Sequence, residues 1–338
     1  MIRRISLFLL CALTVLPASG QTQLNAAGAT FPYPMYSKWF SEYHKVHSDV
    51  QINYQSIGSG GGIRQVIAGT VDFGASDGPM TDDQLKDAKF KILHVPTVLG
   101  AVVPAYNIPG VPGEVKFTPQ ALAGIFLGNI KKWNDKAITS ANPDINFPDR
   151  DIVVVHRSDG SGTTYIFTDF LAKVSPEWKS TIGGEGKGVS ISWPVGIGQK
   201  GNEGVSGQVK QTQGAIGYIE LIYAVQNNIP YGSIKNSAGS FIKASLEGVT
   251  AAAGSVKNMP ADFRVSITNA PGKDAYPISS FTWLLIPVPS KDPAKGKIIV
   301  DFLNWMVTDG QKMTTALSYA PLPDNVAQKV KEEIKLVH

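Results

Sequence analysis

RSDGSGTT, residues Arg157–Thr164, follows an apolar run from Ile152 to Val155 and precedes a helical pattern from Tyr165 to Leu171. A strand, a glycine-rich turn and a helix start form a cradle for an anion, because backbone N–H groups and the positive end of the helix dipole converge there. Glycines let the backbone approach a ligand closely, and a guanidinium can face an oxyanion with two parallel hydrogen bonds. The stretch therefore predicts an α/β unit that binds a tetrahedral oxyanion.

Two further stretches place a hydroxyl at a helix start in the same way as Ser161-Gly162-Thr163. These are Ala29-Thr30-Phe31-Pro32 and Ser59-Gly60-Gly61-Gly62. Taken singly, Thr30, Ser59 and Ser161 are each interpreted most simply as ordinary helix caps. Three such helix starts in one chain, two of them rich in glycine, favour contacts to one shared anion.

Asp77 ends the run Asp72–Asp77 at the carboxyl end of a predicted strand, where α/β sheets place ligand groups. The alternative is a turn aspartate beside Gly78-Pro79. A carboxylate beside an anion is useful only if the ligand carries a proton that the carboxylate can accept. Phosphate carries such a proton near neutral pH and sulfate does not, so an acceptor at this position would select phosphate.

Arginine is scarce beyond residue 20, where the only ones are Arg64, Arg150, Arg157 and Arg264. These four are the candidates for a bidentate anion contact. Asp159 lies two residues after Arg157 around a turn, so an ion pair between them could hold the guanidinium in place. A solvated surface pair is the alternative.

Strand and helix patterns alternate along the chain, which predicts α/β units with a largely parallel sheet. A composition change at Pro109–Gly113 separates two such units.

Thr81 and Gln84 form a predicted capping box at a helix start. The remaining predictions are helices at Tyr33–Lys45, Ile63–Ile67, Ala121–Leu127, Ile298–Val307 and Val326–Leu336, strands at Val50–Ile57, Val71–Ala75 and Phe281–Val288, a turn at Ser59–Gly62, and loops around a strand at Trp193 within Gly183–Gly207.

Residues 1–20 predict a secretory signal peptide, because Arg3-Arg4 precede an apolar run from Ile5 to Leu16 and Ala18-Ser19-Gly20 offers small residues for cleavage. The only cysteine, Cys11, lies inside that run, so no disulfide or cysteine metal site is expected in the exported chain. The remaining residues, about 318, are enough for two domains. We expect a periplasmic protein.

The composition excludes several other classes. The chain has 31 basic and 27 acidic residues with no long basic run, so nucleic acid is not an expected partner. The five histidines show no metal-ligand spacing, and no phosphate-binding loop of the nucleotide-hydrolase type occurs. We therefore expect no metal and no cofactor.

Gly74-Ala75-Ser76-Asp77-Gly78 matches the G-x-S-x-G pattern of serine hydrolases, with His94 or His156 as a possible base. That pattern requires a helix directly after the serine, whereas Pro79 intervenes here. A secreted serine hydrolase is the less favoured interpretation, and the chain is expected not to be an enzyme.

The quoted motifs together are similar to those of the periplasmic phosphate-binding proteins of high-affinity phosphate ABC importers. The resemblance extends over nearly the whole chain beyond residue 20, including Leu127–Trp133, Gly214–Tyr218 and Leu317–Pro323. It departs from the usual pattern at Gly60, where a second serine is typical, and at Ser158, where alanine is. Neither position is a side-chain ligand contact in that pattern.

The resemblance implies an α/β protein of two lobes, with the ligand in the cleft between them and two chain crossovers. Residues 21–98 and 279–338 would form the first lobe, and residues 99–278 the second. The implied partners are inorganic phosphate and the membrane permease subunits of the importer, with the receptor itself a monomer; a receptor for sulfate or molybdate is the alternative. The implied phosphate contacts are Ala29, Thr30, Phe31, Ser59 and Asp77 from the first lobe and Arg157, Ser161, Gly162 and Thr163 from the second, with Asp159 supporting Arg157.

Overall fold

The computed structural model describes residues 21–111 and 113–337, so the predicted signal peptide lies outside the described residues. The chain alternates strands and helices from its first element to β4. These elements are β1 (Thr22–Gly28), α1 (Tyr33–Val46), β2 (Val50–Ser56), α2 (Ser59–Ala68), β3 (Phe73–Ser76), α3 (Asp82–Asp87) and β4 (Lys91–Tyr106).

A second group of elements follows β4. It consists of β5 (Lys116–Phe117), α4 (Pro119–Leu127), α5 (Lys136–Thr139), β6 (Val153–Arg157), α6 (Gly162–Val174), α7 (Pro176–Ile182), β7 (Ile197–Gln199), α8 (Gly201–Gln211), β8 (Ala215–Glu220), α9 (Leu221–Asn227), β9 (Ser233–Lys235), β10 (Phe241–Ile242) and α10 (Leu246–Ala253). The chain then returns through β11 (Ser279–Val288) to α11 (Pro293–Met306), two short 3₁₀ helices (Gly310–Met313 and Thr315–Leu317) and α12 (Asp324–Ile334).

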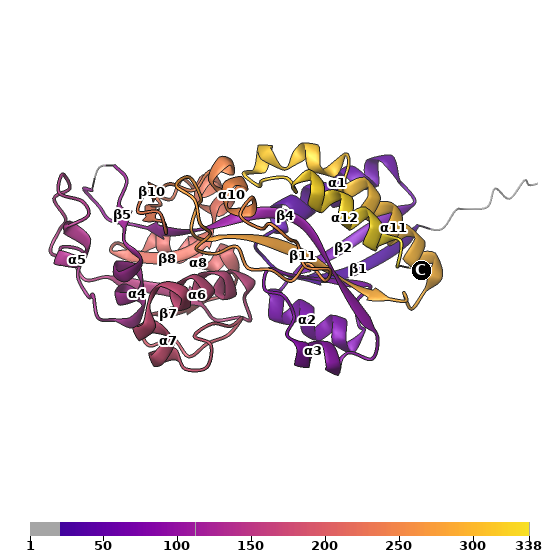
Figure 1. Cartoon of the computed structure of the whole chain (residues 1–338), viewed down its shortest axis with the longest axis horizontal. Coiled ribbons are helices and arrows are strands. Elements are labelled where there is room, and N and C mark those ends of the chain that lie inside the picture. The colour runs from indigo at the N-terminus through magenta and orange to yellow at the C-terminus, as the bar shows by residue number, and fades with distance from the viewer. Residues whose placement is uncertain (1–20, 112, 338) are drawn as a thin grey trace, which may run out of the picture.

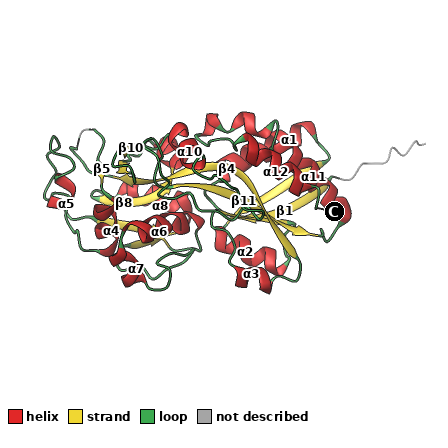
Figure 2. Cartoon of the chain, viewed as in Figure 1, coloured by secondary structure: helices red, strands yellow, loops and turns green. Residues whose placement is uncertain are grey.

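Two bodies result, connected by the long strands β4 and β11. In Figure 1, α1, α2, α3, α11 and α12 lie at one end and α4, α5, α6 and α7 at the other. Figure 2 shows β4 and β11 running between the two ends. The chain thus crosses twice between the two lobes of an α/β fold, as predicted.

One sheet of eight strands passes through both lobes in the order β2-β1-β3-β11-β4-β8-β6-β7, and β10-β9-β5 form a small second sheet. The outer strands pair in parallel, as in β1 with β2 and β6 with β8. However, β11 is antiparallel to β3 and β4, and β4 is antiparallel to β8. The prediction of a largely parallel sheet was therefore wrong at its centre, because the strands that cross between lobes run in opposite directions.

The strand β4 changes partners along its length. Its residues Lys91–Ala101 pair with β11, and Val102–Tyr106 pair with β8. The predicted lobe limits, at 98/99 and 278/279, fall inside β4 and at the start of β11, and they stay predictions.

Local patterns identified most elements, and α1 shows why. Its residues Tyr36, Trp39, Phe40 and Tyr43 are buried, as their spacing of three and four predicts, whereas Tyr33, the first of the same aromatic series, is 37% exposed. The capping box between Thr81 and Gln84 at the start of α3 is also confirmed.

The predicted turn at Ser59–Gly62 was wrong, because Ser59 is the first residue of α2 and Gly58 is its N-cap. Glycine is needed in this first turn: a Cβ on Gly62 would lie 2.6 Å from the Cα of Gly28 and 2.7 Å from the carbonyl oxygen of Ala75. Gly62 thus lets a helix start rest against strand backbone, where the sequence pattern suggested an irregular turn.

Two other local predictions also needed correction. The helix predicted from Tyr165 begins at Gly162. Trp193 lies in no strand; its ring stacks on Tyr218 at 5.5 Å between centroids, so side-chain packing places it and strand pairing does not. The segment predicted as loops also contains β7 and the first residues of the helix α8, which continues to Gln211.

No helix within residues 21–111 and 113–337 is both long and apolar enough to cross a membrane.

Candidate functional site

Thr30 and Phe31 lie between β1 and α1, at the edge where β1 ends, and both are buried. Their carbonyl groups are held by tyrosines from distant elements. Tyr223 donates its hydroxyl to the Thr30 carbonyl oxygen at 2.6 Å, and Tyr319 donates to that of Phe31 at 2.6 Å. With its carbonyls bound in this way, the turn is fixed and the Thr30 hydroxyl is directed into the interior.

Ala29 is also buried, but both of its backbone polar groups are engaged inside the protein. Its N–H donates to the Ala75 carbonyl at 3.1 Å, and its carbonyl accepts from the Tyr54 hydroxyl at 2.7 Å. Ala29 therefore ties β1 to its neighbours and has no polar group free for the ligand, so its predicted contact could be made only by its carbon atoms.

Ser59 and Asp77 meet at the start of α2 and the end of β3, both fully buried. The Ser59 hydroxyl oxygen accepts from the Asp77 backbone N–H at 3.2 Å and from the Gly162 N–H at 3.0 Å. A Cβ on Gly162 would lie 2.4 Å from Ser59 Oγ and 2.5 Å from Asp77 Oδ2, so only glycine fits there. Two of the predicted helix starts are thus in direct contact.

The Asp77 carboxylate has polar neighbours on both oxygens. Its Oδ1 accepts from the Thr282 hydroxyl at 2.8 Å, and its Oδ2 lies 3.4 Å from Ser59 Oγ. Burial raises the pKa of Asp77 to about 7, although Thr282, the charge of Arg157 and Ser59 act in the opposite direction. Asp77 lies in the bend that follows β3 but is buried, so it is not a solvated turn aspartate, and its contact with the ligand stays a prediction.

The raised pKa predicts how stability depends on pH. Because the folded pKa lies above that of the unfolded chain, Asp77 lowers stability progressively as pH rises from about 4 to about 7. In phosphate-free buffer, Asp77→Asn should therefore gain stability relative to wild type by on the order of 2–3 kcal/mol between pH 5 and pH 8. Urea unfolding at the two pH values measures this difference, and parallel stability curves for the two proteins would contradict it.

Arg157 ends β6, and its guanidinium is bound on one edge by Asp159. Nε donates to Oδ1 at 2.7 Å and Nη2 to Oδ2 at 2.5 Å, and the Arg157 side chain is only 1% exposed. Burial raises the pKa of Asp159, but Arg157 and the Gly201 N–H more than offset this and hold that pKa below its usual value. The pair is therefore interior, and the solvated surface pair is excluded. The Nη1 atom of Arg157 faces the Thr163 hydroxyl at 3.4 Å.

Ser161 is the N-cap of α6, as its sequence position suggested. Its hydroxyl oxygen accepts from the Thr164 N–H at 3.0 Å. Gly162 and Thr163 follow as the first two residues of the helix, and both are buried. Ser161 caps the helix in the same cluster in which Gly162 contacts Ser59 and Thr163 contacts Asn202. A residue of this turn can therefore cap the helix and also lie at the predicted ligand site.

Sequence reasoning missed Asn202 and Thr282, which complete the cluster. Asn202 Nδ2 donates to the hydroxyl oxygens of Thr30 at 2.8 Å and Thr163 at 3.1 Å. Asn202 follows Gly201 at the start of α8, so a third glycine-containing helix start was the signal available. Thr282 lies in the apolar strand β11, and no local signal marks it.

The hydrolase interpretation needs Ser76 beside a histidine base. Instead, Ser76 Oγ donates to the Gly78 carbonyl. His94 Nε2 accepts from the Met80 N–H at 3.0 Å, and burial lowers the His94 pKa to about 4. His156 stacks on Trp193 with centroids 5.0 Å apart. Within the described part of the chain, neither histidine has a hydrogen bond to Ser76.

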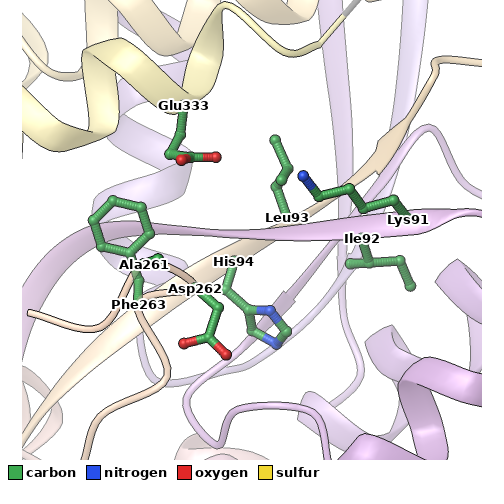
Figure 3. A pocket seen from close by; sticks show the side chains of 8 residues that line it. All are labelled: Lys91, Ile92, Leu93, His94, Ala261, Asp262, Phe263 and Glu333. Carbon is green, nitrogen blue, oxygen red and sulfur yellow. The ribbon is translucent and has the colours of Figure 1, made fainter.

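The side chain of His94 lines a separate cavity of about 210 Å³ beside β4 and α12. Figure 3 shows its imidazole beside the Asp262 carboxylate, with Phe263, Glu333 and Lys91 above both groups in this view. None of the predicted site residues lines this cavity. The cluster around Asp77 and the His94 cavity are therefore distinct places in the molecule.

Comparison with known proteins gives the same assignment for family and fold. A family model described as a PBP superfamily domain matches residues 16–310. The chain is 45% identical over 322 residues to phosphate-binding protein PstS of Xylella fastidiosa, covering 94% of this chain and 87% of that protein. It is 43% identical to phosphate-binding protein PstS of Pasteurella multocida, covering 98% and 95%.

A solved structure of a high-affinity periplasmic phosphate-binding protein, PfluDING bound with phosphate, matches with a TM-score of 0.75 at 23% identity. The match covers 92% of this chain and 93% of that one. That likeness shows the shared two-lobed fold, and the sequence relatives show the family. The chain belongs to the PBP superfamily and, within it, to the family of phosphate-binding proteins named PstS.

Proposed function

We propose that this chain is a periplasmic receptor that captures inorganic phosphate and delivers it to the membrane permease subunits of an ABC importer. Membership of the PstS family supports this function. In this proposal the receptor acts as a monomer, reaches the periplasm through a cleaved signal peptide, and binds its ligand without chemical change. The phosphate contacts are those predicted from the sequence, with Asp159 supporting Arg157.

The observation that carries the proposal is the buried carboxylate of Asp77 among many donors. Arg157, the hydroxyls of Thr30, Ser59 and Thr163, and helix starts supply donors, whereas Asp77 supplies a carboxylate. Donors alone would serve any tetrahedral oxyanion. The carboxylate favours an anion that retains a proton, and among phosphate, sulfate and molybdate that requirement favours phosphate near neutral pH.

Binding is coupled to closure because the donors come from elements on both sides of β4 and β11. The Gly60 N–H donates to the Gly160 carbonyl at 2.9 Å, and Gly162 contacts Ser59. These bonds join the start of α2 to the turn before α6. A ligand that reaches donors from both sides stabilises the closed arrangement over the open one, since the open arrangement offers only part of the donor set.

Equilibrium binding of phosphate and of sulfate at pH 8 tests the proposed function. We expect phosphate to bind at least about tenfold more tightly, because sulfate either leaves the Asp77 carboxylate unpaired and repelled or requires it to take up a proton above its pKa of about 7, a penalty of about 1–3 kcal/mol. Equal affinity for sulfate or molybdate would contradict the phosphate assignment. Turnover of an activated ester that Ser76→Ala abolishes would instead make the protein an enzyme.

A further inference from the structure

Asn202 is fully buried at the second position of α8 and uses both ends of its side-chain amide. Its Oδ1 accepts from the Glu220 backbone N–H at 2.9 Å. Because a backbone N–H can only donate, the amide oxygen must face Glu220 and the amide nitrogen must face the other way. The orientation of the Asn202 amide is therefore determined by the hydrogen-bond network.

The amide nitrogen faces two hydroxyl groups that come from opposite sides of the cluster. Nδ2 lies 2.8 Å from Thr30 Oγ1, in the turn before α1, and 3.1 Å from Thr163 Oγ1, in the first turn of α6. The Asn202 backbone N–H also donates to Thr30 Oγ1 at 3.2 Å. One residue thus binds a hydroxyl from each side.

A hydroxyl group has two acceptor lone pairs and one proton to donate. Thr30 Oγ1 accepts twice, both times from Asn202. Thr163 Oγ1 also accepts twice, from Asn202 Nδ2 and from Arg157 Nη1. Within the described residues, neither hydroxyl donates to a protein acceptor, so each proton is left for a ligand.

We propose that Asn202 is a positioning residue that turns the hydroxyls of Thr30 and Thr163 into obligate donors toward the bound anion. The inference rests on the proposed function, since it requires an oxyanion between the two threonines. A hydroxyl with free lone pairs can present them to an anion and repel it. Asn202 fills both lone pairs of Thr30 Oγ1 and, together with Arg157 Nη1, those of Thr163 Oγ1. This removes the unfavourable orientations before the ligand arrives, which lowers the cost of binding.

A double-mutant cycle for phosphate affinity tests this role. We expect Asn202→Ala to weaken phosphate binding about tenfold in the wild-type background. In a Thr30→Val/Thr163→Val background, the same substitution should change affinity by less than about twofold, because the hydroxyls through which Asn202 acts are gone. A role in folding alone would instead give the same loss in both backgrounds, and that outcome would overturn the proposal.

Matched measurements separate folding from positioning. Asn236 is also a buried asparagine, but its Nδ2 bonds the carbonyls of Gly272, Lys273 and Ala275. Asn236→Ala should lower the melting temperature without changing phosphate affinity. If Asn202→Ala fails to fold, Asn202→Ser takes its place in the cycle, since serine is also too short to bond both threonine hydroxyls but keeps a polar side chain at the helix start.

The same experiment distinguishes failure of this inference from failure of the proposed function. A wild-type protein that does not bind phosphate would overturn both. A wild-type protein that binds phosphate, with unchanged affinity in Asn202→Ala, would overturn only the role of Asn202.

Discussion

Arg157→Ala should weaken phosphate binding on the order of a hundredfold, and by no less than about tenfold. The guanidinium is almost fully buried and is held in position on one edge by Asp159, so its remaining donors are oriented before the anion binds. Hydrogen bonds to a charged group contribute about 1.5–3 kcal/mol, and each 1.4 kcal/mol is about tenfold in affinity. Titration calorimetry with phosphate measures the loss directly.

Two controls isolate the role of the guanidinium. Arg150→Ala removes an exposed arginine and should leave phosphate affinity unchanged. Arg157→Ala also leaves Asp159 without its partner, so the double variant Arg157→Ala/Asp159→Ala removes that stranded carboxylate as well. We expect the double variant to bind phosphate as weakly as Arg157→Ala does. A loss below about twofold in Arg157→Ala would show that the arginine does not contact the anion.

Asp77→Asn should preserve the fold and relax discrimination between phosphate and sulfate by on the order of tenfold to a hundredfold. The wild-type carboxylate can accept the proton of phosphate, whereas it leaves sulfate facing an unpaired charge. An amide can turn its N–H₂ toward either anion, so the penalty against sulfate of about 1–3 kcal/mol or more is lost. The measurement is the ratio of the two dissociation constants at pH 8, where the wild-type Asp77, with a pKa of about 7, is ionised.

Asp83→Asn is the matched control, because the Asp83 side chain is 89% exposed and pairs only with Lys86 among the described residues. It should leave the ratio of dissociation constants unchanged. If Asp77→Asn keeps the wild-type ratio, Asp77 is not the acceptor for the ligand proton, and selectivity must come from the shape of the donor set.

Local sequence patterns identified the strand and helix at Ile152–Leu171, the cap at Ser161 and the aromatic face of α1, because these features depend on neighbouring residues. The same reasoning failed at Ser59–Gly62 and at α8. At Ser59–Gly62, glycines that indicate a turn in isolation lie in a helix start that packs against strand backbone, as the close approach of Gly62 to Gly28 shows. At α8, Gly201, Gly204 and Gly207 likewise lie inside a helix. Tertiary contact overrides local propensity at such positions.

The sequence predicted the helix starts of the candidate site, but it did not predict the hydrogen bonds that connect them. Asn202 bonds a hydroxyl 172 residues away, and Thr282 bonds Asp77 across 205 residues. Periodicity and capping patterns carry no information at that separation. Nor does a sequence reveal that Arg157 and Asp159 form their pair in the interior, since the same residues could form it in solvent.

By itself, the sequence of this protein predicted which donor groups could bind an anion, because each donor lies in a short strand–turn–helix segment whose chemistry is local. Only the tertiary structure decided which of these groups meet and in what state of charge. Desolvation raises the pKa of Asp77 to about 7, and the Asn202 amide leaves the two threonine hydroxyls as donors. Both effects depend on burial and on partners distant along the chain, and these exist only once the chain has folded.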